Sequence, residues 1–389
     1  MLHLINSAAR GGAELYVSEL ILHFQKYGVE NFVVCRKFSL ISKMCNNPGI
    51  RLYFTKASGK FALFQVFKLV KLIKKEKITT VFSHTRNDVF TGSVLKFLTG
   101  ICHVNAIYMG TGPKKDAIHR FVYRRVDALI TSAEFSKNEC ERYLPVPPGA
   151  VKLIRYGRDP FLYELSEKRR TEIRGKMHTP PEKVVIGLLS RIDTGKGVGI
   201  FADAFEYLQQ EVQQKIEFWI MGEPTVKSVN AKGEPTYEEQ ALKLLDKLKA
   251  LSKKHPTSFK LIPFQTEYIA WLQAMDIFVL PTINEMYSLA VVDAMMTGLP
   301  VIGTNAGGTS EQIGRNERGL LVEPGSAKAI ADAIAEMIKN PEEMKQKGEA
   351  ARNWATTQHN FQTTVSQILD VCNEKLPLRN EELPVNLPH

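Results

Sequence analysis

Two acids and two cations in the second half of the sequence have the types and spacing of a ligand-binding site. Glu285 and Asp293 bracket the start of an apolar segment, and Arg191 and Lys196 lie on a glycine-bearing loop. Cations beside the N–H groups of a helix N-terminus form a cradle for a diphosphate. Carboxylates repel phosphate, so Glu285 and Asp293 would instead bind neutral hydroxyls of a sugar or ribose. The alternative is a pair of solvated acids beside a solvated basic turn.

The elements around these residues are those of a parallel sheet. The apolar run 277–280 is typical of a buried strand, Ser288 is a good N-cap, and residues 289–297 are apolar enough for a buried helix. Gly298 stands where a left-handed residue often follows a helix. Residues 184–189 form a second strand that leads into the loop with Arg191 and Lys196. This order places the helix N-termini at the C-terminal edge of a parallel sheet.

The first half of the chain predicts a similar sheet. A short strand, a Gly11-Gly12 turn and an amphipathic helix over residues 14–27 form the opening unit of a doubly wound domain. His84 follows one strand, and Met109-Gly110 follows the next, so both lie where binding sites form in such folds. A plain tight turn at Gly11-Gly12 and a structural histidine at position 84 are the alternatives.

Length and composition predict a globular protein of two α/β domains. A chain of 389 residues is too long for one ordinary core, and 44% hydrophobic with 24% charged residues is a globular composition. No run of residues is apolar enough for a membrane span. The N-terminal sequence lacks the features of a signal peptide. Five scattered cysteines predict a reducing compartment and no structural zinc site.

The positive charge is concentrated in the first half. Residues 1–180 hold 30 Lys and Arg against 14 Asp and Glu, and the remainder holds 21 against 27. Such asymmetry predicts an anionic partner for the first domain. The lysine-rich helix 61–75 could lie on an anionic bilayer or, the reading we favour, could be a crossover helix packed on the sheet. A second basic patch with interleaved aromatics spans residues 114–125 and raises the odds of a membrane-facing surface. Nucleic acid fits the charge alone, because no binding module accompanies it.

Five short motifs in order resemble the retaining GT-B glycosyltransferases, the large group that includes glycogen and sucrose synthases and many bacterial cell-envelope enzymes. The motifs are Gly11-Gly12-Ala13-Glu14, Ser190-Arg191 with Gly195-Lys196-Gly197, Met221-Gly222-Glu223-Pro224, Glu285-x7-Asp293, and Thr304-x2-Gly307-Gly308-x2-Glu311. Each motif alone is unspecific, but all five at fitting spacing cover most of the chain. The resemblance implies an α/β fold of two Rossmann-like domains facing across a cleft, with a C-terminal helix that crosses back to the first domain.

The resemblance also implies a division of the chain. We expect an acceptor-binding domain (1–165), a linker (166–183), a donor-binding domain (184–358), a helix that crosses back (359–375) and a loose tail (376–389). Arg191 and Lys196 would clamp the donor diphosphate and stabilise the leaving group, and Glu285 would hold donor-sugar hydroxyls. Asp293 would take the ribose diol.

The remaining site residues follow from the same resemblance. Backbone N–H groups of Tyr287, Ser288 and Leu289 would face the sugar and phosphate. The other donor-side candidates are Gly11, Gly12, Gly222, Phe264 and Gln265, the last two beside the base. The acceptor-side candidates are His84, Met109 and Gly110. Enzymes of this group need no divalent metal and no other cofactor, because Arg and Lys take the role of the metal.

Three departures from the family pattern concern the site. The second acid is Asp293 rather than glutamate, and Met286-Tyr287-Ser288 replaces the common Phe-Gly pair. Met109-Gly110 stands where many relatives carry His-Gly, so His84 or His103 could cover the role of that histidine.

The predicted function is transfer of a sugar from a nucleotide-diphosphate donor, such as a UDP or GDP sugar, to a hydroxyl of a lipid-linked envelope glycan such as lipopolysaccharide or O-antigen. The expected partners are the nucleotide sugar, a glycan or glycolipid acceptor, and the inner membrane surface, which the basic first domain would meet. We expect a cytoplasmic protein, peripheral on that surface. The alternatives are a nucleotide-sugar epimerase of GT-B fold and a non-catalytic nucleotide-sugar binding protein.

Overall fold

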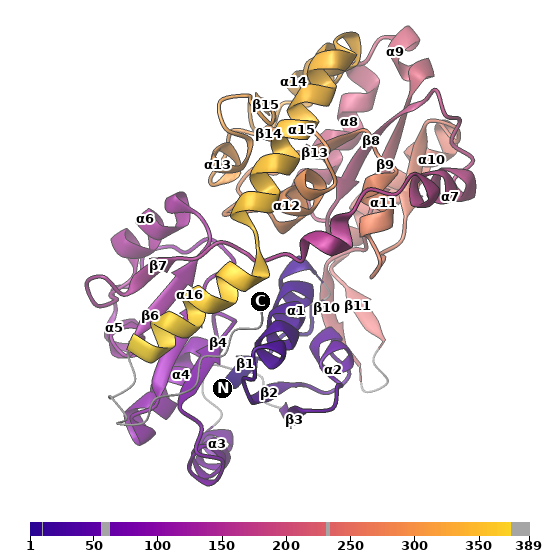
Figure 1. The fold of residues 1–389 in the computed structure, drawn as a ribbon. Coiled ribbons are helices and arrows are strands. Elements are labelled where there is room, and N and C mark those ends of the chain that lie inside the picture. The colour runs from indigo at the N-terminus through magenta and orange to yellow at the C-terminus, as the bar shows by residue number, and fades with distance from the viewer. Residues whose placement is uncertain (10, 56–62, 231–233, 375–389) are drawn as a thin grey trace.

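Two parallel sheets with the same winding form the frame of the protein (Figure 1). The computed structural model describes residues 1–9, 11–55, 63–230 and 234–374. The strand orders are β3-β2-β1-β4-β5-β6-β7 and β12-β9-β8-β13-β14-β15. In each sheet the order reverses beside the first strand of its domain, between β1 and β4 and between β8 and β13. Ligands of doubly wound sheets bind at such reversal points, at the C-terminal ends of the strands.

The first sheet is built from short apolar runs, and its central strands are buried on both faces. Its strands are β1 (Leu2–Ile5), β2 (Asn31–Arg36), β3 (Ile50–Thr55), β4 (Thr80–Ser83), β5 (Cys102–Ala106), β6 (Ala128–Thr131) and β7 (Val151–Leu153). Its helices are α1 (Gly12–Lys26), α2 (Leu40–Met44), α3 (Leu63–Lys75), α4 (Asp88–Thr99), α5 (Ala117–Tyr123) and α6 (Glu134–Tyr143).

The second sheet repeats this plan. Its strands are β8 (Val184–Leu189), β9 (Ile216–Met221), β12 (Phe259–Ile262), β13 (Ile277–Leu280), β14 (Val301–Thr304) and β15 (Gly319–Val322). Its helices are α8 (Val198–Tyr207), α9 (Gln210–Lys215), α10 (Glu239–Lys254), α11 (Ile269–Gln273), α12 (Leu289–Met296), α13 (Thr309–Ile313), α14 (Ala327–Lys339) and α15 (Pro341–Gln358). β13 pairs with β8 through Ile277 and Ile186, so the loops that follow these two strands lie side by side.

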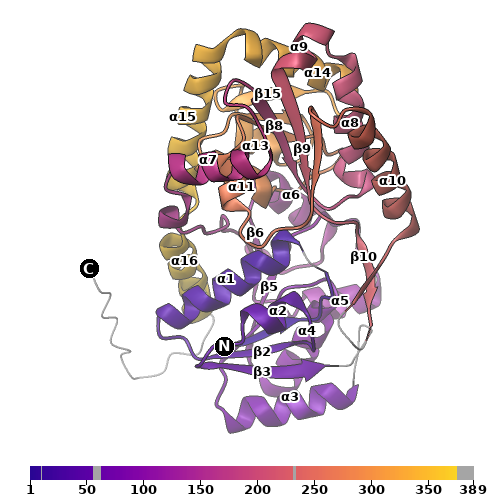
Figure 2. The same ribbon diagram turned by 90° about the vertical axis from the view of Figure 1, so that its right-hand side faces the viewer.

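The last helix returns to the first domain. α15 packs on α12 of the second domain, the chain turns at His359-Asn360, and α16 (Phe361–Glu374) packs on α1. Figure 2 shows α15 and α16 running down one side of the molecule past both domains. The Phe361 ring stacks on His23, with ring centroids 3.9 Å apart. The predicted break near His359 and the crossing-back helix are therefore confirmed.

The predicted cap and end of helix α12 and the predicted packing of helix α3 are found in the structure. The Ser288 hydroxyl caps α12 by accepting a bond from the Val291 N–H at 3.3 Å, and Gly298 has a positive φ of 79°. α3 buries Val66, Leu69 and Ile73 against the first sheet and exposes its lysines, as a crossover helix should. The start of that basic helix (61–62) and the expected loose tail (376–389) lie outside the described residues.

Two segments differ from expectation. The stretch after β9, for which the sequence analysis gives no strand, forms a hairpin of β10 (Val226–Val229) and β11 (Pro235–Tyr237). Region 166–183 contains a helix, α7 (Glu167–Lys176), which packs on α11. Arg170 and Arg174 of α7 both pair with Asp276, at 2.6 and 2.5 Å. These ion pairs attach the segment to the second domain.

Candidate active site

The predicted catalytic cation and acid meet at the reversal point of the second sheet. Lys196 Nζ lies 2.7 Å from Glu285 Oε2, and the two side chains are 30% and 11% exposed. The other carboxylate oxygen of Glu285 accepts the N–H of Met286 at 3.2 Å. Lys196 precedes α8 and Glu285 precedes α12, so the pair stands in front of two helix N-termini. Both groups remain partly accessible to a ligand.

Two glycines let the surrounding loops approach each other this closely. A Cβ on Gly197 would lie 1.9 Å from the carbonyl oxygen of Pro281, and one on Gly307 would lie 1.8 Å from that of Glu285. Both glycines also have positive φ, 68° and 57°. Any other residue would push the three loops apart. The motif glycines therefore hold the site together from three strand ends.

Arg191 lies on the same loop as Lys196 and is partly exposed. Within the described part of the chain, its guanidinium forms no hydrogen bond or ion pair, so all its donors are available to a ligand. Gly222 packs against the carbonyl of Ser190. Phe264 and Gln265 follow β12 and are partly exposed. The loop after β8 thus presents one paired and one unpaired cation.

The start of α12 differs in one respect from the expected cradle of free N–H groups. The N–H of Ser288 already donates to Gln312 Oε1 at 3.1 Å, and Gln312 donates back to the Ser288 carbonyl at 2.8 Å. The hydroxyl of Tyr287 is held by Arg155 at 3.0 Å and lies 3.1 Å from His359 Nε2. Leu289 faces Gly12 of the first domain.

Asp293 has a different set of partners from the expected ribose diol. Its Oδ1 accepts from Arg158 Nε at 2.5 Å and from the Tyr163 hydroxyl at 2.6 Å. Its Oδ2 accepts from Arg158 Nη2 at 3.2 Å and from the Tyr268 hydroxyl at 3.0 Å. The residue is 3% exposed. A carboxylate offers about four lone-pair positions, and four donors use them. The ribose contact stays a prediction that would need one of these donors to leave.

The buried ion pair of Arg158 and Asp293 joins the two domains. Arg158 follows β7 and is 2% exposed, and its Nη1 also lies 3.2 Å from Glu19 of α1. Burial raises the pKa of Glu19 and is the largest effect on it. The charge of Arg158 lowers this pKa, and the charge of Asp293 raises it further. The negative charge of Asp293 keeps the pKa of Arg158 well above its ordinary value despite burial.

Glu311 makes a second contact between the domains. Its carboxylate accepts the N–H groups of Glu134 at 3.0 Å and Phe135 at 2.7 Å. These are the first two residues of α6, whose N-cap, Ala133, has no side-chain acceptor. A carboxylate of the second domain therefore occupies the anion-binding end of a first-domain helix.

The two histidines that the sequence analysis considered for the acceptor side, His84 and His103, have different surroundings. His103 is fully buried between Ser83 and Ser93, away from any surface. His84 lies behind Tyr108, with 2.9 Å between His84 Nδ1 and the Tyr108 hydroxyl. Burial lowers the pKa of His84 well below its ordinary value, so the ring is neutral near pH 7. The neighbouring Met109 is exposed, and Gly110 lies against Met286.

Comparison with known proteins identifies the family. The model for glycosyl transferases group 1 matches residues 169–354, and the model for glycosyltransferase family 4 matches residues 10–160. The chain belongs to the GT-B glycosyltransferases.

Individual relatives of this glycosyltransferase are distant. D-inositol 3-phosphate glycosyltransferase of Corynebacterium efficiens is 26% identical over 251 residues, which are 62% of this chain and 56% of that protein. The lipopolysaccharide core biosynthesis mannosyltransferase LpsB of Rhizobium meliloti is 25% identical over 62% of this chain and 63% of its own length. The chain thus spans little more than half of the first relative.

Solved structures show the same fold. HepE of Anabaena, solved in complex with UDP-glucose, superposes with a TM-score of 0.81 at 18% identity, covering 96% of this chain and 99% of that one. WaaG, a glycosyltransferase involved in lipopolysaccharide biosynthesis, gives a TM-score of 0.71 at 13% identity over 95% and 99% of the two chains.

Sequence reasoning missed several residues of this glycosyltransferase that connect its domains. Arg155 and His359 contact the hydroxyl of Tyr287, just before α12, and Arg158 contacts Asp293 within that helix. Arg158 stands in the segment 156–159, which the sequence predicts only as a turn, and Arg155 comes directly before it. Two arginines at the end of a domain, one directly before and one directly after the pair Tyr156-Gly157, were the available signal. It is weak, because partners 132 and 135 residues away are not visible in the sequence.

Neither a metal centre nor a membrane span is found in the described ranges. Among those residues, no group of three His, Cys, Asp or Glu side chains is arranged to hold a metal ion. No helix there has both the length and the hydropathy to cross a bilayer. Metal-independent catalysis remains a prediction.

Proposed function

We propose that this glycosyltransferase moves a sugar from a nucleoside-diphosphate sugar to a hydroxyl of a lipid-linked envelope glycan, with retention at the anomeric carbon and without a divalent metal. The contact between Lys196 and Glu285 at 2.7 Å carries this proposal. It combines a cation suited to a diphosphate with an acid suited to sugar hydroxyls, in front of two helix N-termini.

The donor occupies the reversal point of the second sheet. Arg191 and Lys196 bind the diphosphate and stabilise the charge that develops on the leaving phosphate. Glu285 accepts bonds from the donor sugar, and releases Lys196 to the phosphate as the ligand enters. Phe264 and Gln265 lie beside the base. The fold shared with HepE, a protein that binds UDP-glucose, favours a uridine nucleotide.

The acceptor class is inferred from the relatives and from one face of the first domain. LpsB and WaaG act in lipopolysaccharide synthesis by name. The side chains of Phe97 on α4 and of Ile118 and Phe121 on α5 are exposed, and the Arg125 guanidinium lies 5.1 Å from the Phe97 ring centroid and 3.8 Å from that of Phe121. We call this set the α4–α5 patch. Aromatic rings with cations suit the interface of an anionic membrane.

Two substitutions test the donor site. Glu285→Ala and Lys196→Ala should each reduce transfer by at least about a hundredfold, because each removes a charged contact made in the transition state. Both proteins should keep the wild-type melting temperature to within a few degrees. Glu239→Ala and Lys243→Ala are matched controls, because these residues form an exposed 2.7 Å pair on α10. Full turnover by either site variant would refute the assignment.

The donor and the metal independence can be tested with the intact protein. A thermal-shift panel of nucleoside diphosphates and nucleotide sugars should single out the true donor, because a ligand that binds only the folded state stabilises it. Product analysis with that donor, with and without EDTA, should show transfer to an acceptor in both cases. A strict metal requirement, or conversion of the donor alone, would contradict the proposal.

Membrane association through the α4–α5 patch has its own test. Vesicles with anionic lipid should co-sediment with the wild-type protein more than zwitterionic vesicles do, and high salt should weaken binding. Phe97→Ser with Phe121→Ser should reduce binding severalfold. Phe161→Ser is the control, because Phe161 is 79% exposed but lies outside the patch. Equal binding by the double variant would exclude this surface.

A further inference from the structure

A chain of buried hydrogen bonds ends on a tyrosine of the acceptor side. Asn31 Oδ1 lies 3.0 Å from His3 Nε2, His3 Nδ1 lies 3.1 Å from His84 Nε2, and His84 Nδ1 lies 2.9 Å from the Tyr108 hydroxyl. Asn31 and His3 are fully buried and His84 nearly so, whereas Tyr108 is partly exposed. The chain thus runs from the core to the surface of the first domain.

The asparagine fixes the direction of the first bonds. The amide nitrogen of Asn31 donates to the carbonyl oxygens of Val29 at 2.8 Å and Ile21 at 3.4 Å. Its oxygen therefore faces His3, and Nε2 of His3 must carry a proton to donate to it. Burial lowers the pKa of His3 to about 3, so the ring is neutral and has a single N–H. Nδ1 of His3 is consequently an acceptor.

The same reasoning extends to the tyrosine. Because His3 Nδ1 accepts, His84 Nε2 must donate, and the neutral His84 ring has no proton left on Nδ1. The Tyr108 hydroxyl must therefore donate its hydrogen to His84. Toward its other neighbours the Tyr108 oxygen can only accept a hydrogen bond.

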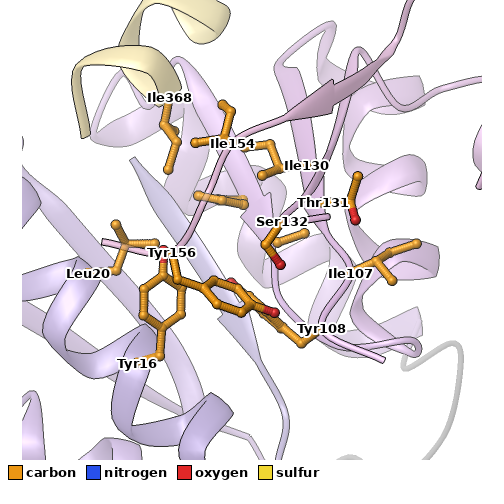
Figure 3. A pocket seen from close by; sticks show the side chains of 12 residues that line it. Tyr16, Leu20, Ile107, Tyr108, Ile130, Thr131, Ser132, Ile154, Tyr156 and Ile368 are labelled. Carbon is orange, nitrogen blue, oxygen red and sulfur yellow. The ribbon is translucent and has the colours of Figure 1, made fainter. Parts of the chain in front are cut away.

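Tyr108 lies where an acceptor would approach the donor motif. It lines a small cavity together with Tyr16, Thr131, Ser132 and Tyr156 (Figure 3). The cavity has room for about one water-sized group. Among the described residues, the buried Thr131 hydroxyl in its wall has no hydrogen-bond partner.

Two ring contacts lead from this cavity to the donor side. The centroids of Tyr108 and Tyr156 are 6.0 Å apart, and those of Tyr156 and Tyr287 are 5.8 Å apart. A Cβ on Gly110, two residues after Tyr108, would lie 3.3 Å from Met286 Sδ. The cavity is therefore next to the segment that carries Glu285.

A second observation concerns charge on the same side. The N–H groups at the start of α6, which have no acceptor within their own helix, donate to the Glu311 carboxylate. Arg155 Nη1 lies 3.9 Å from that carboxylate. The α6 amides and Arg155 are therefore compensated by the Glu311 carboxylate, and Tyr108 offers an anion no proton.

We propose that Tyr108 is an acceptor-positioning residue that receives a hydrogen bond from a hydroxyl of the incoming sugar, and that this end of the acceptor is an uncharged polyol rather than a phosphate. This inference rests on the proposed function. A sugar hydroxyl can donate to the Tyr108 oxygen, whereas a phosphate dianion is an acceptor only and would meet a lone pair. His84 and His3 act through Tyr108 by fixing its proton.

The proton arrangement can be tested without any substrate. In protein labelled with 15N-histidine, long-range 1H–15N correlation should show Nε2 protonated and Nδ1 unprotonated in both His3 and His84 from pH 6 to 8. Tyr108→Phe should shift the Nδ1 resonance of His84, because its hydrogen bond is lost, and leave that of His103 unchanged. A proton on Nδ1 of His84 would overturn the proposal.

The acceptor preference is tested by kinetics at a saturating concentration of the donor found by thermal shift. The probes are octyl glucoside, octyl galactoside and octyl mannoside, each with and without a 6-phosphate. Wild type should favour the neutral member of a pair at least tenfold in kcat/KM. Tyr108→Phe should raise KM for the neutral acceptor about tenfold, the loss of one hydrogen bond, with donor KM unchanged.

The control and the contrary outcomes are distinct. Tyr207→Phe removes a tyrosine hydroxyl on an exposed face of α8, away from the cavity, and should leave acceptor KM within about twofold of wild type. An unchanged acceptor KM in Tyr108→Phe, or equal use of phosphorylated acceptors, would overturn the assignment. Absence of transfer by the wild-type protein to every probe would count against the proposed function instead, and the histidine spectrum would still decide the role of Tyr108.

Discussion

The two acids at the start of α12 belong to one sequence motif but have opposite surroundings. Glu285, in the loop before the helix, contacts one lysine and stays partly exposed. Asp293, in the second turn, accepts bonds from an arginine and two tyrosines and is buried. One carboxylate is available for exchange with a ligand, and the other is saturated by protein.

This difference shows what decides the role of an acid in such a motif. The helix sets where each carboxylate lies, but donors from elsewhere in the chain set whether it is free. Arg158 and Tyr163 both come from the segment between the two sheets. A lysine can leave Glu285 for a phosphate, whereas removal of Asp293 would strand a buried guanidinium. Glu285 is therefore suited to binding and Asp293 to joining the domains.

The largest expected effect is on stability. Asp293→Ala should lower the free energy of unfolding by about 3–5 kcal/mol, because it leaves the Arg158 charge buried without its main partner. Glu285→Ala should change it by less than about 1 kcal/mol, because its lysine is accessible to water. Urea unfolding followed by circular dichroism compares the two. Equal destabilisation by both variants would remove the distinction drawn between the acids.

Low pH should destabilise the folded protein through His359, whose ring lies 3.1 Å from the Tyr287 hydroxyl just before α12. Burial lowers the pKa of His359 to about 3, below the ordinary 6.5. Below pH 6.5, His359 therefore binds a proton in the unfolded chain but not in the folded protein. The contribution of His359 to the free energy of unfolding is complete well above pH 6.5 and is lost as pH falls toward 3. From pH 6.5 to 5 the loss is about 2 kcal/mol for His359 alone. His359→Gln should show a correspondingly shallower pH dependence in urea unfolding; an unchanged slope would contradict this.

The smallest effect concerns the tyrosines around Asp293. Tyr268→Phe should lower the free energy of unfolding by about 1 kcal/mol, the usual cost of one hydrogen bond, and Tyr207→Phe on an exposed face should cost nothing measurable. The same variant sharpens the comparison of the two acids. It frees one lone pair of Asp293, so an unchanged Kd for the nucleotide in calorimetry is expected if Asp293 is structural. Tighter binding of the nucleotide would instead support the prediction that Asp293 binds the ribose diol.

The fold class was predictable because its signals are local. Apolar runs such as 277–280, the N-cap Ser288 and the left-handed Gly298 each depend on neighbours within a few residues. The short β10–β11 hairpin was not, because strands of four and three residues with polar side chains resemble a loop.

The site was predictable only in part for a related reason. Lys196 and Glu285 could be assigned to one sheet edge, since both follow strands of the same parallel sheet. The bond from Tyr108 to His84 and the pair of Arg158 with Asp293 depend on the relative placement of loops and domains. No periodicity in the sequence carries that information, and the free energy that fixes it comes from many packing contacts.

The bond between Glu311 and the start of α6 has a consequence for motion. Any separation of the domains would take the acceptor away from the N–H groups of Glu134 and Phe135 and make them available to solvent deuterium. Their exchange rates therefore measure how often the protein opens. The capped helix belongs to one domain and the capping carboxylate to the other. Hydrogen exchange at these two backbone amides would therefore report on a movement of one domain against the other.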